Sequence, residues 1–341
     1  MHKARFIVLF LSLLVFLAFT VVWSFDDVAN DNNLVLRTVY CSSTAELQLA
    51  LKNVQPGDRI MLKPGIYTGE KNNSGYSYAH FYSGKQGTAA KPIIIESEDP
   101  SDPAILEGNS GDWGYVLYIT GDYWEVRNLK IRTGKKGIML DKSNYSLIYG
   151  CEVFEIGEEG IHLRDGSSHN IIENCNLHDI GLFNPGYGEG VYVGSDKGKW
   201  DQFEKACDHN IINNCIFGPN VAAEHIDIKE GTTGTIVEHC LFNGTGITGE
   251  NSADSFIDVK GNNSIIRNNI GHRNSNFKIS DAFQVNERVP GWGIDNEFYG
   301  NTLYLDNFHP YIINVKKGSA KASDNIRIPE GNKYKGRVKV Y

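Results

Sequence analysis

The sequence predicts an all-β fold, a parallel β-solenoid wound by one chain, with a helix that caps its N-terminal end. The first observation behind this prediction is a short strand motif in which one residue stands between two apolar residues. The motif recurs at spacings of 21 to 35 residues, which is typical of solenoids, and its period of two excludes helices. The copies are Leu117–Ile119, Ile138–Leu140, Ile161–Leu163, Val191–Val193, Ile226–Ile228, Ile257–Val259, Phe283–Val285 and Ile313–Val315.

The second observation is a polar or cysteine-containing element that follows most of these strands at a nearly constant distance. We therefore expect two strands in each repeat, with neighbouring coils paired at ~4.8 Å. The 36 glycines and the many asparagines then form the turns between coils. The copies of this element are Arg127–Leu129, Tyr149–Cys151, Glu173–Cys175, Asn213–Cys215, Glu238–Cys240, Arg267–Asn269 and Tyr299–Asn301.

The N-terminal segment predicts a route out of the cell. Lys3 and Arg5 precede an apolar run over residues 6–23, which is the pattern of a secretory signal peptide. The run is also long enough to be an uncleaved membrane anchor. We expect residues 1–24 to direct secretion, with the anchor as the alternative. Four glycosylation sequons agree with a secreted glycoprotein: Asn72, Asn144, Asn243 and Asn262.

Residues 25–65 predict a cap for the open end of the solenoid. Ser43 and Glu46 form a capping box that opens an amphipathic helix, and a strand follows over residues 59–62. Such a cap hides the apolar core and the unpaired strand edge. The solenoid itself is expected over residues 66–317. A polar and basic segment, a loose C-terminal cap or tail, follows over residues 318–341.

Composition and charge limit the function. The 341 residues carry a formal net charge of −8 and no long basic tract, which excludes a nucleic-acid partner. A polyanionic partner would need a locally basic groove. We expect a monomer that contacts a membrane only through an uncleaved anchor. The cysteines at the repeated position are expected to form a buried ladder of free thiols. Cys41 and Cys207 lie outside that position and could form a disulfide in an oxidising compartment.

The alternation of the strands places four charged residues on one outer face. The two apolar residues of each motif point inward and the residue between them points outward. Asp227 then lies next to Asp258 on the following coil, and Lys229 lies next to Lys260. Two neighbouring ammonium groups lower each other's pKa, which favours one neutral base near pH 7. The alternative is a surface ladder of ion pairs without chemistry. Inserted loops cluster at these coils, which favours a functional site.

Several stretches resemble right-handed parallel β-helix proteins of the pectin-lyase-like type and, among them, the alginate lyase/chondroitinase B family of polysaccharide lyases. Residues 224–229 resemble the rung that carries the catalytic lysine of that family, here Lys229. Residues 256–262 fall at its catalytic arginine rung, where this chain has Lys260. Further similar stretches are residues 47–67, 87–95 and 188–195. The resemblance implies a right-handed parallel β-helix.

The resemblance also implies a secreted polysaccharide lyase that cleaves a uronic-acid-containing glycan by β-elimination. The C5 proton of a uronate is weakly acidic, so cations must neutralise the adjacent carboxylate before a base removes the proton. We assign Lys229 as the base and Lys260 as the neutraliser or proton relay. The expected contacts with the acidic polysaccharide are Arg164, His162, Tyr192, His225, Asp258 and Lys316.

The family's calcium site uses Asn, Glu and Glu, of which this chain matches only Glu224, with Gly186 and Ala222 at the other two positions. Oxygen ligands suit Ca²⁺, and the ligands expected here are Glu189, Glu224 and Asp227. Two other functions stay open. A glycoside hydrolase would use paired carboxylates, Asp227 with either Asp258 or Glu224. A non-catalytic solenoid would bind carbohydrate or another surface without cleaving it.

Overall fold

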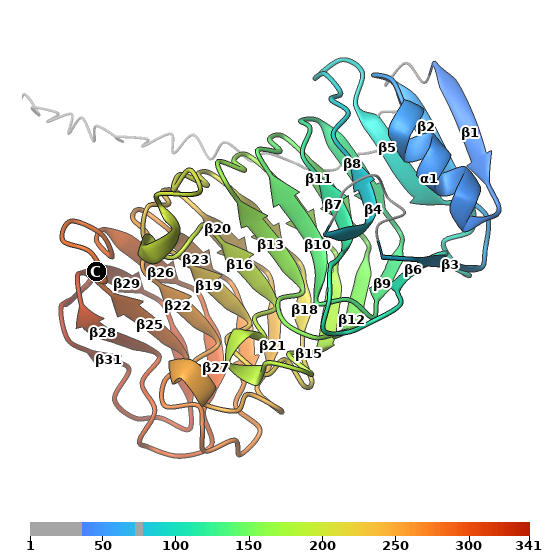
Figure 1. The fold of residues 1–341 in the computed structure, drawn as a ribbon. Helices are drawn as coiled ribbons and strands as arrows, with labels where there is room; N and C mark the ends of the chain where they lie inside the picture. The colour runs from blue at the N-terminus through green and yellow to red at the C-terminus, as the bar shows by residue number, and fades with distance from the viewer. Residues whose placement is uncertain (1–35, 72–77) are drawn as a thin grey trace, which may run out of the picture. The chain divides into compact units, whose positions relative to one another are not determined.

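The computed structural model describes residues 36–71 and 78–341, which wind into three parallel sheets (Figure 1). The predicted signal or anchor segment, residues 1–24, lies outside the described residues. We call the three sheets A, B and C. Along the chain, each coil adds one strand to sheet C, then one to sheet A and then one to sheet B. No helix within the described ranges is both long and apolar enough to cross a membrane.

Sheet A has twelve strands, and sheets B and C have ten each. Sheet A contains β1 (Arg37–Cys41), β2 (Asp58–Leu62), β5 (Ile93–Ser97), β8 (Trp124–Arg127), β11 (Leu147–Tyr149), β14 (Ile171–Glu173), β17 (Ile211–Asn213), β20 (Ile236–Glu238), β23 (Ile265–Arg267), β26 (Asn296–Tyr299), β29 (Ala320–Ser323) and β32 (Val338–Val340). Sheet B contains β3 (Ile66–Gly69), β6 (Ile105–Gly108), β9 (Lys130–Arg132), β12 (Glu152–Ile156), β15 (Asn176–Ile180), β18 (Ile216–Phe217), β21 (Leu241–Asn243), β24 (Ile270–His272), β27 (Thr302–Tyr304) and β30 (Ile326–Ile328). Sheet C contains β4 (Ala79–Ser83), β7 (Tyr115–Ile119), β10 (Lys136–Asp141), β13 (Ile161–Arg164), β16 (Val191–Val193), β19 (Ile226–Ile228), β22 (Ile257–Val259), β25 (Phe283–Asn286), β28 (Ile313–Lys317) and β31 (Tyr334–Lys335).

The predicted strand motifs all belong to sheet C, in the register that the sequence predicted. Ile161 pairs with Val191, Val191 with Ile226, and Ile226 with Ile257. These aliphatic side chains are fully buried inside the solenoid. Aliphatic side chains at equivalent positions of successive coils stack on one another and form one continuous apolar core. The prediction of a parallel β-helix is confirmed.

Each coil has three strands rather than the two that the sequence suggested. The turn from sheet A to sheet B is a single residue with a left-handed backbone, as at Asn174 (φ 56°), Asn268 (φ 56°) and Gly300 (φ 66°). Asparagine and glycine tolerate this conformation better than other residues do. Because so short a bend leaves no loop in the sequence, the strands of sheets A and B were predicted as one element.

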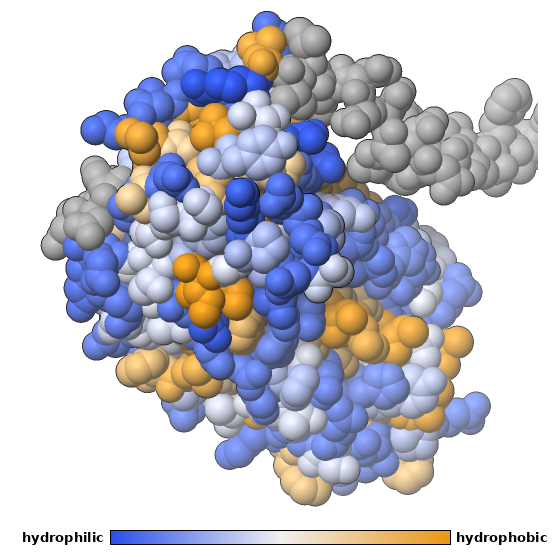
Figure 2. Space-filling view, turned by 90° about the vertical axis from the view of Figure 1, so that its right-hand side faces the viewer, coloured by the Kyte–Doolittle hydropathy of each residue, from blue (hydrophilic) through white to orange (hydrophobic). Residues whose placement is uncertain are grey.

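The predicted cap is present as helix α1 (Thr44–Asn53). The Ser43 hydroxyl accepts a hydrogen bond from the Glu46 backbone N–H at 3.3 Å, and Glu46 accepts from the backbone of Ser42 rather than Ser43. Leu47 and Leu51 are buried against the first coil. On the side where α1 and β1 lie in Figure 1, hydrophilic residues cover most of the surface (Figure 2).

The expected C-terminal tail is part of the solenoid. Residues 318–341 contribute β29, β30, β31 and β32, which extend all three sheets. Ala320 and Ala322 of β29 are buried. The polar composition misled the prediction because these strands pair through backbone hydrogen bonds and bury the polar Asn325 and Arg327 beside the two small alanines.

The cysteine ladder is present, and the disulfide is not. Cys151, Cys175, Cys215 and Cys240 are buried free thiols, each directly before a strand of sheet B. Cys41 and Cys207 are also buried and free, so the two thiols that were open to a disulfide are not joined. Beyond the thiols, a ladder of buried asparagine amides continues the same position: Asn269, Asn301 and Asn325.

Candidate active site

The outer face of sheet C carries the predicted site residues in three parallel columns. The backbone pairing of β13, β16, β19 and β22 aligns them from coil to coil. The first column precedes the strands and holds carboxyl groups, Glu159, Glu189 and Glu224. The middle column consists of His162, Tyr192, Asp227 and Asp258. The third column includes the cations Arg164, Lys229 and Lys260.

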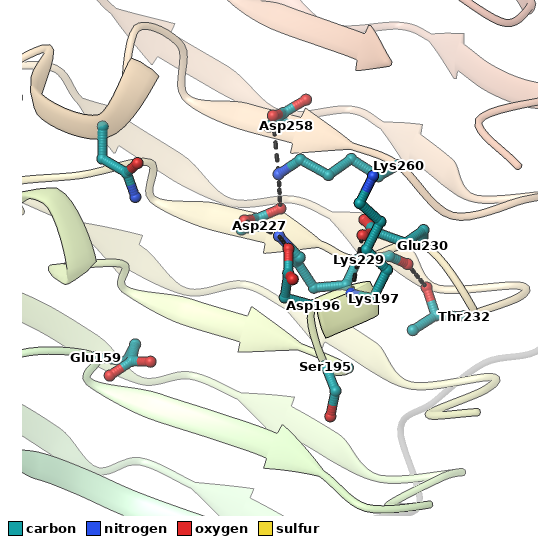
Figure 3. A network of polar contacts seen from close by, with 12 residues as sticks. Glu159, Ser195, Asp196, Lys197, Asp227, Lys229, Glu230, Thr232, Asp258 and Lys260 are labelled. Carbon is teal, nitrogen blue, oxygen red and sulfur yellow. Dashed lines mark hydrogen bonds and ion pairs between the residues drawn. The ribbon is translucent and has the colours of Figure 1, made fainter. Parts of the chain in front are cut away.

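Two aspartates and two lysines form a charged cluster in these columns, which we call the Asp–Lys cluster (Figure 3). Lys260 Nζ lies 2.6 Å from Asp227 Oδ1 and 2.9 Å from Asp258 Oδ2. Lys229 Nζ lies 3.5 Å from Asp227 Oδ2. Asp227 pairs with Asp258 in register, as predicted. Both lysine side chains are about nine-tenths buried. The cluster therefore differs from a ladder of solvent-exposed ion pairs.

The lysines do not lower each other's pKa as the sequence suggested. Burial opposes their charge, but Asp227 and the other neighbouring carboxylates together outweigh it and raise the pKa of Lys229 and of Lys260 above the usual range. Asp258 and Asp196 add to this effect. The expectation of a neutral lysine near pH 7 is therefore wrong for the free protein, because a carboxylate lies between the two ammonium groups.

Among the described residues, no lysine, arginine or histidine forms an ion pair with Glu189 or Glu224. Burial, reinforced by Glu159 and Asp227, raises the pKa of Glu189 to about 8. Burial and Asp227 also raise the pKa of Glu224 well above its usual value. Glu189 Oε2 is buried and makes no hydrogen bond within the described chain. These two carboxyl groups favour the protonated form at neutral pH.

The predicted metal ligands do not assemble into a metal centre in this structure. Asp227 directs both of its oxygens at lysines. Within residues 36–71 and 78–341, no three carboxylate, histidine or cysteine side chains come close enough together to hold an ion. The unpartnered oxygen of Glu189 is the one feature that matches a ligand. The trio Glu189, Glu224 and Asp227 therefore does not fit a calcium site as it stands.

Tyr192 and His162 stand beside the Asp–Lys cluster, as expected of substrate contacts. Lys229 Nζ lies 5.2 Å from the centre of the Tyr192 ring, and the His162 ring lies 4.6 Å from the same ring. His162 is held by the Gly194 carbonyl at 3.1 Å and by Glu159. Burial and Asp227 raise the pKa of Tyr192 well above its usual value, so its phenol keeps its proton.

Arg164 and Lys316 lie on the same face but away from the cluster. Arg164 binds both oxygens of Asp141, at 2.9 and 2.6 Å, and its guanidinium lies 3.9 Å from the centre of the Phe203 ring. It therefore holds the loop after β16 in place. Lys316 lies in β28, and 39% of its side chain is exposed. Its Nζ lies 3.7 Å from Asp254 Oδ1.

His225 does not face the outside at all. Its side chain has no exposed surface and stacks among Phe217, Phe242 and Phe256 in the core. It directly precedes the inward residue Ile226, and the backbone turns it inward at the corner between sheets. The expectation that His225 binds substrate is wrong for this reason.

Three inserted loops flank the cluster and contribute residues that the sequence did not reveal. After β16 the chain passes through the short helix η2 (Lys197–Lys199), and Asp196 there lies 3.7 Å from Lys229. On the other side, η1 (Pro185–Tyr187) and η3 (Glu250–Ser252) are joined by a hydrogen bond from Asn251 to the Gly186 carbonyl. Irregular loops carry no period, so nothing in the sequence placed Asp196.

Glu159 was also missed, although a pattern in the sequence could have found it. Glu159-Gly160-Ile161 repeats the pattern of Glu189-Gly190-Val191 one coil earlier. Its carboxylate pairs with Lys136 and faces His162 at 3.5 Å. The pair of glutamates therefore marks the same column on neighbouring coils.

Comparisons with known proteins agree with this architecture. A family model described as "Pel9A-like, right handed beta helix region" matches residues 28–183. Pectate lyase L from Dickeya chrysanthemi is 26% identical over 144 residues, and pectate lyase L from Dickeya dadantii (strain 3937) is 27% identical over 136. The matched regions cover 40% and 38% of this chain. They span about a third of the length of these relatives, 33% and 31%.

Solved structures extend the likeness over nearly the whole chain. The crystal structure of pectate lyase Pel9A superposes with a TM-score of 0.58 at 16% identity, over 87% of this chain and 78% of that one, which supports the fold. An alginate lyase from Paenibacillus sp. str. FPU-7 is 52% identical, with a TM-score of 0.85 over 89% of this chain and 99% of that one. With a relative this similar matched almost from end to end, the chain belongs to the right-handed β-helix polysaccharide lyases.

Proposed function

We propose that this polysaccharide lyase is secreted and cleaves a uronic-acid-containing glycan by β-elimination at the Asp–Lys cluster. The observation that carries the proposal is the position of two buried ammonium groups, Lys229 and Lys260, beside Tyr192 on the outer face of sheet C. An anionic sugar bound there meets positive charge in a poorly solvated site, where electrostatic stabilisation is strongest.

In this proposal Lys260 neutralises the uronate carboxylate and Lys229 removes the C5 proton. The C5–H electron pair forms the C4–C5 double bond, and the bond from C4 to the glycosidic oxygen breaks. The leaving oxygen takes a proton from Tyr192, whose phenol stays protonated and stands next to Lys229. Lys229 must enter the step as a neutral amine, so it first releases to the solvent the proton that Asp227 stabilises. After the elimination, the C5 proton on Lys229 passes to the Tyr192 phenolate, which restores both groups.

The other predicted contacts take supporting positions in the proposal. His162 packs against Tyr192 and fixes the direction of its ring. Asp258 holds Lys260 in place. Arg164 anchors the loop after β16. Lys316 lies in β28, away from the cluster. No step is assigned to Ca²⁺, and the predicted requirement for it is tested with a chelator.

Alginate is the first substrate to test, because the 52% identical relative is an alginate lyase. Pectate follows, because the pectate lyases match a shorter part of the chain. A screen of alginate, pectate, glucuronan and glycosaminoglycans measures the ultraviolet absorbance of the C4–C5 double bond, with and without chelator. We expect new absorbance with at least one polyuronate.

Two other outcomes would overturn the proposal. New reducing ends without the absorbance would show a hydrolase. Retention of the glycans without any product would show a binding protein. Asp227 and Asp258 are both bound to Lys260, so neither is placed as the protonated acid that a hydrolase needs.

A further inference from the structure

Three cations project from two loops beside the Asp–Lys cluster and have no role in the proposed chemistry. Lys197 and Lys199 lie in the loop after β16, and Arg288 lies in the loop after β25. All three are exposed to solvent. We call residues 195–200 and 286–293 together the cationic arch.

The two loops of the arch meet although β19 and β22 lie between their strands. Lys197 Nζ donates to the Arg288 carbonyl at 3.4 Å. The Lys197 backbone N–H donates to Glu230 Oε1 at 3.1 Å, directly after Lys229 (Figure 3). The arch therefore runs past the strand ends from which Lys229 and Lys260 project, and forms one side of the cluster.

Hydrogen bonds at both ends hold the arch in place. Trp200 Nε1 donates to the Ser195 carbonyl at 3.1 Å. Asn262 donates to the Gly291 carbonyl and accepts from the Ile294 backbone N–H, each at 3.0 Å. Glu287 accepts from the Gly291 backbone N–H at 3.0 Å. A loop fixed in this way presents its charges without a large ordering cost on binding.

The charges of the arch are not neutralised within the described chain. Asp196, the nearest carboxylate in sequence, turns to Lys229, and Glu287 turns to Lys317. None of Lys197, Lys199 and Arg288 has a carboxylate within ion-pair distance among the described residues. In a chain with a net charge of −8, unpaired cations beside the cluster raise the local concentration of an anionic chain.

We propose that the cationic arch is a second anion subsite, which binds the carboxylate of a uronate residue further along the same glycan. Arg288 follows a strand two coils beyond the strand of Lys229. At ~4.8 Å per coil, the two strands are ~10 Å apart along the solenoid axis. The two-residue repeat of an extended polyuronate is of similar length. The substrate class is therefore a polymer that carries a carboxylate at least on every second residue, as a polyuronate does. The inference rests on the proposed function of the cluster.

Charge reversal at Arg288 tests the subsite without breaking the arch, because Lys197 binds the backbone carbonyl of residue 288. We expect R288E to raise the KM for a polyuronate about fivefold and to change kcat less. R288K should restore the KM. The matched control is K52E, at an exposed lysine in the last turn of α1, which should leave both constants unchanged. Thermal melting checks that each variant is folded.

A partly methyl-esterified form of the same polymer tests whether a carboxylate is the group recognised. The KM penalty of R288E should shrink on the ester, because the carboxylate that Arg288 binds is then absent. A KM for R288E equal to that of the wild type, or an equal penalty on both polymers, would overturn the subsite while the lyase proposal stands. If the wild type forms no unsaturated product from any polyuronate, the proposed function itself fails.

Discussion

Asp227 holds two lysine ammonium groups at once, and this sets what each can do. Its carboxylate has a pKa lowered below the usual range, since Lys229 and Lys260 outweigh the effect of burial. The same contacts keep both lysines charged in the free protein. Removing either partner would leave an unpaired buried charge, which is costly.

The raised pKa of Lys229 predicts that activity rises into the alkaline range. The neutral amine is the reactive form, and its fraction increases about tenfold for each pH unit below that pKa. We expect kcat/KM on the best polyuronate to climb from pH 7 towards pH 10. A profile that is flat or falls over this range would contradict a lysine base.

His225 predicts a loss of stability in acid. Burial lowers its pKa from 6.5 to about 3, so between these values the unfolded chain binds a proton that the folded chain does not. Stability is then complete above the unfolded pKa and falls by about 1.4 kcal/mol per pH unit below it. Urea unfolding at pH 7.5 and pH 5 measures this loss. H225F, which matches the neighbouring Phe217 and Phe242, should lose about 2 kcal/mol less. Equal losses in the two proteins would contradict this assignment.

At the scale of the element, the ladders and one-residue turns hold the coils in register. Asn301 donates to the Ile266 carbonyl and accepts from the Asn269 backbone N–H, at 2.9 and 3.1 Å. It has no exposed surface. Asn269 and Asn301 also donate to the asparagine of the next coil, Asn301 and Asn325 respectively, so these two amides bond to the coils on both sides. The cysteines of the earlier coils fill the same space as small apolar groups.

Truncation of this ladder should be costly. N301A leaves buried donors and acceptors unpaired, and we expect it to lower the free energy of unfolding by about 2–3 kcal/mol. The control is N213A, which removes a half-exposed hydrogen bond to Glu173 and should cost under about 1 kcal/mol. Urea denaturation of both variants measures the difference. Similar losses would show that the amide ladder is not a specific support.

The strands could be predicted because each repeats the same alternation of apolar and polar residues. The loops could not, because their sequences have no repeated pattern. Asp227 and Asp258 followed from register alone. Asp196, Lys197 and Arg288 come from loops of different length, so only the structure brings them to the cluster. The direction of the lysine pKa shifts depended on where the Asp227 oxygens point, which spacing does not determine.

At the scale of the whole molecule, the solenoid is one continuous stack that is closed at one end by α1 and extended at the other by β29 to β32. The periodic core was predictable from about residue 115 to residue 315. The final coil was not, because its strands are polar and its buried residues include Asn325 and Arg327 beside the small Ala320 and Ala322. Its stability depends on the coil below it.

Deletion of residues 319–341 tests the role of that last coil. A loose tail could be removed without effect. The structure instead predicts a lower Tm and a tendency to aggregate, because β26 and β27 would become exposed edges. Calorimetry and light scattering on the shortened chain measure both effects, and an unchanged Tm would contradict this account of the coil.

The most direct test of the central claim is the rate of K229R on the best polyuronate. Arginine keeps the positive charge beside Asp227 but does not deprotonate in proteins. If Lys229 is the base, K229R should bind the polymer and lose kcat by about 10²- to 10⁴-fold, as K229A does. A K229R enzyme that forms the unsaturated product at more than about a tenth of the wild-type kcat would show that Lys229 supplies only charge, and the base would have to be another residue.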